Sequence, residues 1–298
     1  MLDNILITVI AKLRIKKLLW PSADDPEFLR KITSKQRENS RYLPWWMMRG
    51  FTVSCMDLNG YSCYAVSPKS QHISGQILFI HGGAFVLPIS NLHWRTITDL
   101  VRRTGQTLIV PEYPLVPGSN YVNIHNQILA VYEMIKTTTH HDKISVVGDS
   151  AGGNLALALL QLIDKSEQPG NVVLLSPVVD LRVSNASIDK LDAVDPILPL
   201  AAIRHLLPKY YTGSSANDPL ISPLFADYSK IHSKLYILNG GKDLLSPDIE
   251  LFHRELLRQN VPHCYVFEKY LSHAWPIFPL SSSRGTRKHI AEWCSAGD

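Results

Sequence analysis

The stretch Val146-Val147-Gly148-Asp149-Ser150-Ala151-Gly152-Gly153-Asn154 joins a short apolar run to a longer apolar segment, residues 151–165. The run is typical of a buried strand and the segment of a helix, which is the setting of a G-x-S-x-G nucleophile elbow. Gly148 and Gly152 are expected where strand and helix cross, because a Cβ atom at either position would clash. Ser150 is therefore the candidate nucleophile.

Apolar runs and helical patterns alternate along the rest of the chain. Strands are predicted over residues 51–58, 61–66, 76–80, 107–110, 144–148, 171–175, 235–238 and 264–267. Helices are predicted over residues 91–103, 119–137, 151–165, 247–259 and 286–295. Continuous apolar strands separated by helices are typical of a mostly parallel sheet covered on both faces. Eight strands, the first two forming an antiparallel hairpin, predict an α/β fold with the sheet of an α/β-hydrolase.

Two segments do not fit this alternation, residues 1–50 and 181–211. Their predicted helices are an amphipathic helix within residues 2–13, a helix after Asp24-Asp25-Pro26 and a helix over residues 199–211. We expect both segments to form a helical cap over the carboxyl ends of the strands, with residues 51–180 and 212–298 as the catalytic core.

The N-terminal segment carries the basic charge of the chain. The formal net charge is +4, and residues 1–50 hold ten Lys/Arg against five Asp/Glu, which leaves 20 against 21 in the rest. The apolar stripe of the first helix can pack on the protein, contact a membrane surface through residues 1–20 or meet a partner helix, and the sequence favours packing. No recognisable nucleic-acid-binding motif accompanies the basic residues, so no nucleic-acid partner is expected.

No part of the sequence has the pattern of a membrane span or a secretory signal. The apolar runs are far shorter than the roughly 20 residues that cross a bilayer. Asp3 precedes the N-terminal apolar run and Lys12 and Arg14 follow it, whereas a signal peptide carries its positive charge first. We therefore expect no transmembrane segment and a cytoplasmic location.

The cysteines form neither a metal-binding spacing nor a disulfide scaffold; they are Cys55, Cys63, Cys264 and Cys294. Asn59-Gly60 predicts a two-residue hairpin turn, in which Met56 pairs with Cys63. Cys55 then lies one residue out of register on the opposite face, so free thiols are expected.

His140-His141-Asp142 also suggests a metal ion. Neighbouring side chains diverge, however, and no second ligand pair follows at a suitable spacing, so a loop before a strand explains these residues better. We expect no metal site and no cofactor.

A glycine pair follows the strand predicted over residues 76–80, in the motif His81-Gly82-Gly83-Ala84-Phe85. Glycines let main-chain N–H groups point inward, and such fixed donors stabilise the negative charge that develops on a carbonyl oxygen under attack. Gly82 and Gly83, together with Ala151 after the candidate nucleophile, are expected to form an oxyanion hole. An ordinary Gly-Gly turn is the alternative.

Asp243 and His273 complete the candidate triad in the chain order serine, acid, histidine. Asp243 follows a predicted strand, and a carboxylate at that place can orient an imidazole. Asp248 and Glu250 are rival acids, but they open the next helix, where acidic residues are favoured. His273 lies in the loop after the last strand and is expected to be the general base.

Large apolar side chains of the cap segments are expected to line a covered substrate pocket. The expected pocket residues are Trp45, Trp46, Met47, Leu206 and Leu207, with Phe85 from the glycine-pair motif, and Trp20 and Met48 belong to the same apolar set. Such clusters are also typical of plain core.

These motifs together resemble the hormone-sensitive-lipase-like branch of the α/β-hydrolases, a family of serine esterases. The similar segments are His81-Gly82-Gly83-Ala84 (HGG), Tyr113-Pro114-Leu115-Val116-Pro117 (Y-x-L-x-P), Gly148-Asp149-Ser150-Ala151-Gly152-Gly153 (GDSAGG) and Asp218-Pro219-Leu220-Ile221-Ser222-Pro223-Leu224 (D-P-x-x-S-P-L). The resemblance covers residues 76 to 280. Ala84 stands where a third glycine is usual, and Pro114 and Gly118 replace the common Arg and Glu of the Y-R-L-A-P-E turn. These departures concern loop geometry and substrate preference more than catalysis.

The resemblance implies a serine carboxylesterase that acts through an acyl-enzyme on Ser150. The apolar residues of the cap segments predict short- to medium-chain acyl esters as its substrates. The same triad could serve a lipase, an amidase or a peptidase, and a non-catalytic ligand-binding protein could share the fold. Activity is expected to rise with pH through a histidine pKa of about 6–7. The expected partner is a small-molecule ester, and the sequence leaves a homodimer open.

Overall fold

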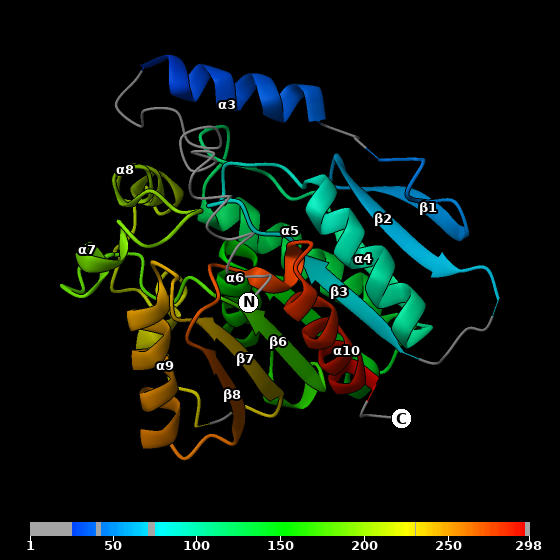
Figure 1. The fold of residues 1–298 in the computed structure, drawn as a ribbon. Helices are drawn as coiled ribbons and strands as arrows, with labels where there is room; N and C mark the ends of the chain where they lie inside the picture. The colour runs from blue at the N-terminus through cyan, green and yellow to red at the C-terminus, as the bar shows by residue number, and fades with distance from the viewer. Residues whose placement is uncertain (1–25, 40–42, 71–74, 230, 296–298) are drawn as a thin grey trace.

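An eight-stranded sheet forms the centre of the computed structural model, which describes residues 26–39, 43–70, 75–229 and 231–295 (Figure 1). Its strands are β1 (Phe51–Leu58), β2 (Tyr61–Pro68), β3 (Gln76–Ile80), β4 (Thr107–Pro111), β5 (Ile144–Asp149), β6 (Asn171–Leu175), β7 (Lys234–Gly240) and β8 (His263–Glu268). They lie in the order β1-β2-β4-β3-β5-β6-β7-β8. β2 pairs antiparallel with β1 and β4, and every other pair is parallel. The predicted α/β-hydrolase sheet is confirmed.

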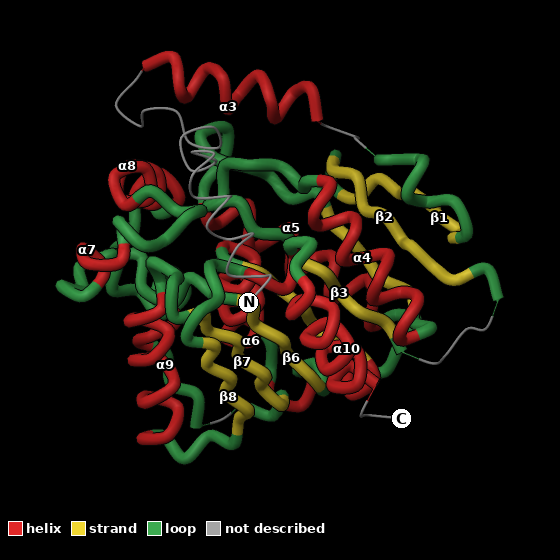
Figure 2. Tube along the Cα trace, viewed as in Figure 1, coloured by secondary structure: helices red, strands yellow, loops and turns green. Residues whose placement is uncertain are grey.

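Successive side chains of each strand point to opposite faces of the sheet, so an apolar core forms on each face. In β3, Ile77 and Phe79 enter one core while Leu78 and Ile80 enter the other, as the period of two requires. The helices that cover the first face are α4 (Asn91–Thr104) and α10 (Ser281–Ser295), and those that cover the second are α5 (Tyr121–Lys136), α6 (Ala151–Leu162) and α9 (Ser246–Arg258). Figure 2 shows the strands enclosed between these helices.

The remaining helices come from the two segments that interrupt the alternation. They are α3 (Pro26–Asn39), α7 (Ile188–Leu191) and α8 (Leu200–Tyr210). Outside those two segments lie the short helices η1 (His141–Lys143), η2 (Lys165–Glu167), η3 (Pro223–Phe225) and η4 (Trp275–Ile277). α3 and α8 match the helices expected after Pro26 and over residues 199–211. The helix expected within residues 2–13 lies outside the described residues.

α3 contacts the body of the protein through an apolar and a polar set of side chains. Phe28 and Ile32 are buried in the core that also holds α5 and α6. Gln36 donates from Nε2 to the carbonyl oxygens of Val86 (2.7 Å) and Val116 (2.8 Å). α3 is therefore anchored to the loop that follows the glycine-pair motif.

The hairpin of β1 and β2 has the register expected from Asn59-Gly60. Met56 lies opposite Cys63, and Cys55 lies opposite Tyr64, so the two thiols do not meet. All four cysteines are free, which confirms that prediction.

Within the described residues, no helix combines the length and apolar character needed to span a bilayer.

Candidate active site

Ser150 occupies a strained turn between β5 and α6. Its backbone has φ 54° and ψ −118°, a conformation that non-glycine residues adopt only where the surroundings enforce it. The Ser150 N–H donates to the Leu175 carbonyl (2.9 Å), which ties the turn to β6. A Cβ atom at Gly152 would overlap the Ile80 carbonyl oxygen, and one at Gly148 would overlap that of Gly152. The predicted reason for both glycines is confirmed.

His273 and Asp243 form a buried pair in the loops after β8 and β7. The His273 Nδ1 lies 3.0 Å from both Asp243 carboxylate oxygens, so it carries the proton and leaves Nε2 as the free acceptor. Ser150 and His273 line the same cavity. The rival acids lie elsewhere: Asp248 accepts from the Asn185 amide (3.0 Å), and Glu250 pairs with Arg254.

The charge around His273 favours its protonated form. Burial by itself lowers the pKa of His273, but the charge and hydrogen bond of Asp243, together with the charges of Asp195 and Asp149, raise the pKa above the ordinary 6.5. A raised pKa strengthens His273 as a proton acceptor and moves the acid limb of its titration upward.

The glycine-pair loop presents different donors from those expected. The Gly82 N–H donates to Asp149 Oδ1 (3.0 Å), so it is not free to meet an oxyanion. Gly83 and Ala84 instead line the cavity beside Ser150. In the described part of the chain, their N–H groups and that of Ala151 donate no hydrogen bond. The geometry therefore does not support Gly82 as an oxyanion donor and points to Ala84 in its place.

Asp149 and His93 hold this loop against the elbow. The Ser90 N–H donates to His93 Nδ1 (3.0 Å), which leaves His93 Nε2 to donate to Asp149 Oδ2 (3.3 Å). Burial alone would raise the pKa of Asp149, but His93 and the Gly82 N–H lower it, so the carboxylate stays charged. Asp149 belongs to the GDSAGG motif, but the sequence did not indicate that it holds the glycine-pair loop. No sequence pattern pointed to His93 as its partner.

A mainly apolar cavity of about 190 Å³ opens at Ser150 and His273. Its other lining residues are Gly83, Ala84, Leu87, Pro88, Ser90, Leu92, His93, Asp149, Val178, Ile197, Leu198, Ile203, Leu207, Leu245, Ala274, Ile277 and Phe278. The cavity is smaller than the roughly 300–1,000 Å³ of typical drug-sized ligand sites. Its walls therefore suit a small apolar group.

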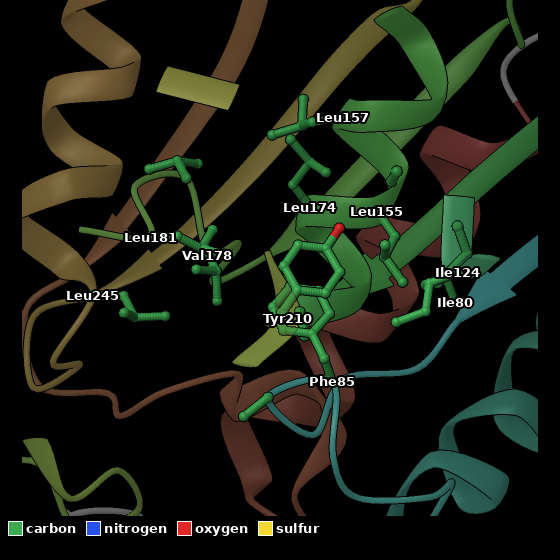
Figure 3. Close-up of a cluster of buried hydrophobic side chains, with 14 of the residues drawn as sticks. Ile80, Phe85, Ile124, Leu155, Leu157, Leu174, Val178, Leu181, Tyr210 and Leu245 are labelled. Atoms are coloured by element: carbon green, nitrogen blue, oxygen red, sulfur yellow. The ribbon is translucent and has the colours of Figure 1, made fainter. Parts of the chain in front are cut away.

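Of the expected pocket residues, Leu207 lines this cavity and five do not. Leu206 is its neighbour on α8, about 100° around the helix, and faces the core instead. Phe85 stacks on Tyr210 with ring centroids 3.8 Å apart (Figure 3). Trp45 and Trp46 are 64% and 47% exposed. Met47 packs against the core beneath α4, and Trp20 lies outside the described residues.

Asp195 is a buried carboxylate of the cap segment that the sequence did not single out. Its Oδ1 accepts from the N–H groups of Ile197 (2.7 Å) and Leu198 (2.9 Å), and its Oδ2 accepts from that of Leu244 (2.7 Å). Burial and the neighbouring charge of Asp243 raise its pKa to about 6. Asp195 thereby joins two residues of the cavity wall to the loop that carries the candidate acid Asp243.

Comparisons with known proteins agree with this fold. A family model described as alpha/beta hydrolase fold matches residues 77–277. The chain is 31% identical over 231 residues to a triacylglycerol lipase of Mycobacterium tuberculosis, which covers 76% of this chain and 47% of that protein. It is 34% identical over 198 residues to an esterase of Acinetobacter venetianus, which covers 65% of each. The chain thus matches between about half and two thirds of the length of these relatives.

A solved structure is similar over almost the whole chain. The esterase/lipase from an uncultured bacterium superposes with a TM-score of 0.82 and covers 98% of both chains at 21% identity. At that identity the likeness concerns the fold. The family model covers more than half of the chain and its ends bracket Gly82 and His273. The chain belongs to the alpha/beta hydrolase fold family.

Proposed function

We propose that the protein is a serine carboxylesterase that hydrolyses short- to medium-chain acyl esters. The observation that carries this proposal is the meeting of Ser150 and His273 in one small apolar cavity, with Asp243 bonded to the histidine. The names of the two relatives, lipase and esterase, support ester hydrolysis. The motifs that resemble the hormone-sensitive-lipase-like branch support it as well.

In the proposed reaction, His273 Nε2 takes the Ser150 hydroxyl proton as the oxygen attacks the ester carbonyl carbon. The resulting oxyanion accepts from the N–H groups of Gly83, Ala84 and Ala151. The carbonyl reforms, the C–O bond to the alcohol breaks, and His273 returns the proton to the departing alcohol. Water then attacks the acyl-enzyme by the same two proton transfers and releases the acid. Each step uses groups of the chain itself, and we propose no cofactor.

The size of the cavity favours a short acyl group. A volume of about 190 Å³ bounded by Ile197, Leu198 and Leu207 leaves little room for a long chain unless the wall moves. A lipase would need either an open channel or a displaced cap. The excess positive charge of residues 1–50 keeps that alternative open, because it would favour anionic lipid surfaces.

Location, partners and domain division rest on the sequence. We infer a cytoplasmic enzyme with a small-molecule ester as its partner, a core of residues 51–180 and 212–298, and a cap from residues 1–50 and 181–211. Vesicle co-sedimentation of a chain lacking residues 1–20 tests peripheral membrane contact, and light scattering tests a homodimer.

The decisive experiment measures hydrolysis of p-nitrophenyl esters of increasing acyl length by wild type and Ser150→Ala. We expect activity to be greatest on short and medium chains and to disappear in the variant. Ser229→Ala, at an exposed serine that does not line the cavity, is the matched control and should behave as wild type. Equal traces of activity in wild type and Ser150→Ala would reject the esterase in favour of a binding protein. Greater activity on chains of twelve or more carbons would favour the lipase, and activity on anilides alone an amidase.

A further inference from the structure

A group of histidines lies at the edge of the sheet opposite the candidate active site. His140, His141 and Asp142 precede β5, and His232 precedes β7, whereas Ser150 follows the far end of β5. β5 has six residues, so the two sites are separated by about 20 Å of strand. We call these four residues the histidine cluster.

The ligand atoms of three of these residues lie close enough together to surround one metal ion. One atom each from His140, His141 and Asp142 lies within 4.8 Å of the others. An Asp142 oxygen is 3.4 Å from His140 Nδ1. Neighbouring ligands of a tetrahedral zinc ion lie roughly 3.3–3.5 Å apart, given metal–ligand distances of about 2.0–2.2 Å.

His232 supplies the ligand that the sequence did not reveal. Its Nε2 lies 4.0 Å from Asp142 Oδ1, and its side chain is half exposed, so a small rotation brings it into contact. His232 is remote in sequence from the other three residues, which is why spacing rules did not find it. The prediction made from the sequence considered only a second ligand pair, so it did not test a single ligand from a distant loop.

The buried Gln168 fixes the loops that carry these side chains. Its carbonyl oxygen lies 3.1 Å from His141 Nδ1, its side-chain oxygen accepts from the His232 N–H (2.7 Å), and its amide donates to the Leu160 carbonyl (2.9 Å). The Gly170 N–H also donates to the His141 carbonyl (3.2 Å). These bonds hold the His141 side chain and the main chain at His232 in place beside each other.

The bond to Gln168 also suits metal coordination. A carbonyl acceptor at Nδ1 makes that atom the donor, which leaves a lone pair on His141 Nε2. Histidines that bind metals are commonly oriented in this way by a carbonyl partner. Imidazoles with one carboxylate favour zinc, copper and nickel over magnesium or calcium.

We propose that His140, His141, Asp142 and His232 form a binding site for a divalent transition-metal ion of the zinc class. Binding joins the start of β5 to the start of β7. Because the unfolded chain does not bring these residues together, the ion stabilises the folded protein by mass action. The site is remote from Ser150, so its occupancy leaves the esterase reaction unchanged.

Calorimetric titration of the full chain with Zn²⁺ tests this site. We expect one equivalent to bind, His141→Ala to abolish binding, and His232→Ala to weaken it roughly tenfold. His289→Ala removes an exposed histidine on α10 and is the matched control, with unchanged affinity expected. Mg²⁺ should not compete.

Two further measurements separate this site from stray binding by other histidines or thiols. Co²⁺ should give the visible absorption bands of a tetrahedral site in wild type and not in the His140→Ala/His232→Ala double variant. Zn²⁺ should raise the Tm of wild type and not of that variant, whose two substituted side chains are exposed enough to leave folding intact. Equal Zn²⁺ affinity in wild type and the double variant, or no binding to wild type, would overturn the proposal. Ester hydrolysis should be the same in both.

Discussion

The loops at the strand ends, which hold the candidate triad, are built differently from the cavity wall that faces them. This wall is formed by Ile197, Leu198, Ile203 and Leu207 of the predicted cap segment, and we call it the cap wall. Ser150, Asp243 and His273 are fixed by backbone geometry and charged hydrogen bonds at the carboxyl ends of strands. The wall is fixed mainly by apolar packing, and one carboxylate, Asp195, ties it to the loop after Asp243. The structure of the strand-end loops is determined by which residue type stands at a given place in the sequence. The structure of the cap wall depends on whether each apolar side chain faces the cavity or the core.

The strongest test of the strand-end region is the identity of the acid. Asp243→Asn should lower kcat by about 10⁴-fold, because a neutral amide neither stabilises the imidazolium nor holds the required tautomer of His273. The matched variant Asp248→Asn replaces the rival acid on α9 and should leave kcat almost unchanged. Single-turnover and steady-state rates on a short-chain ester measure both. The reverse ranking would transfer the catalytic role to Asp248.

A smaller effect is expected from the group that holds the oxyanion loop. Asp149→Asn removes the charge that the Gly82 N–H and His93 stabilise, so Gly83 and Ala84 lose their fixed placement. We expect kcat to fall by about 10²-fold with little change in KM, because the donors matter most in the transition state.

Asp164→Asn, at an exposed aspartate after α6, is the control for the Asp149 variant and should match wild type. Circular dichroism and the Tm of both variants separate a loop effect from unfolding. A rise in KM with an unchanged kcat in Asp149→Asn would show that the pair serves substrate binding instead.

The difference between the two regions explains what the sequence could predict. The order of strands and helices, the elbow and the hairpin register follow from local patterns, and the structure confirms them. Gly82 was expected to be an oxyanion donor, but motif spacing does not show that its N–H already donates to Asp149. Phe85 was expected in the pocket, but its ring stacks on that of Tyr210, a residue distant in sequence, and does not line the cavity.

Leu206 and Leu207 test the cap wall as a matched pair on one helix turn. Leu207→Ala enlarges the cavity and should raise the preference for eight-carbon over four-carbon esters by roughly tenfold. Leu206→Ala leaves a void in the core instead, so it should lower the free energy of unfolding by about 2–5 kcal/mol without changing chain-length preference. A panel of p-nitrophenyl esters and denaturant melts measure both. If the two variants changed specificity equally, α8 would move as a unit and the wall would not be defined residue by residue.

The smallest expected effect concerns the contact between the two regions. The charge of Asp195 is one of the influences that raise the pKa of His273 above 6.5, and only the neutral imidazole accepts the Ser150 proton. Removing that charge in Asp195→Asn should lower the pKa of His273, so the acid limb of the kcat/KM profile should move to lower pH. Asp192→Asn, on the same cap loop and bonded to the Leu200 N–H, is the control and should keep the wild-type profile. An acid limb that stayed in place while KM alone rose would mean that Asp195 only supports the wall formed by Ile197 and Leu198. A limb that moved to higher pH would contradict the prediction, because it would show that the charge of Asp195 is not a net cause of the raised pKa of His273.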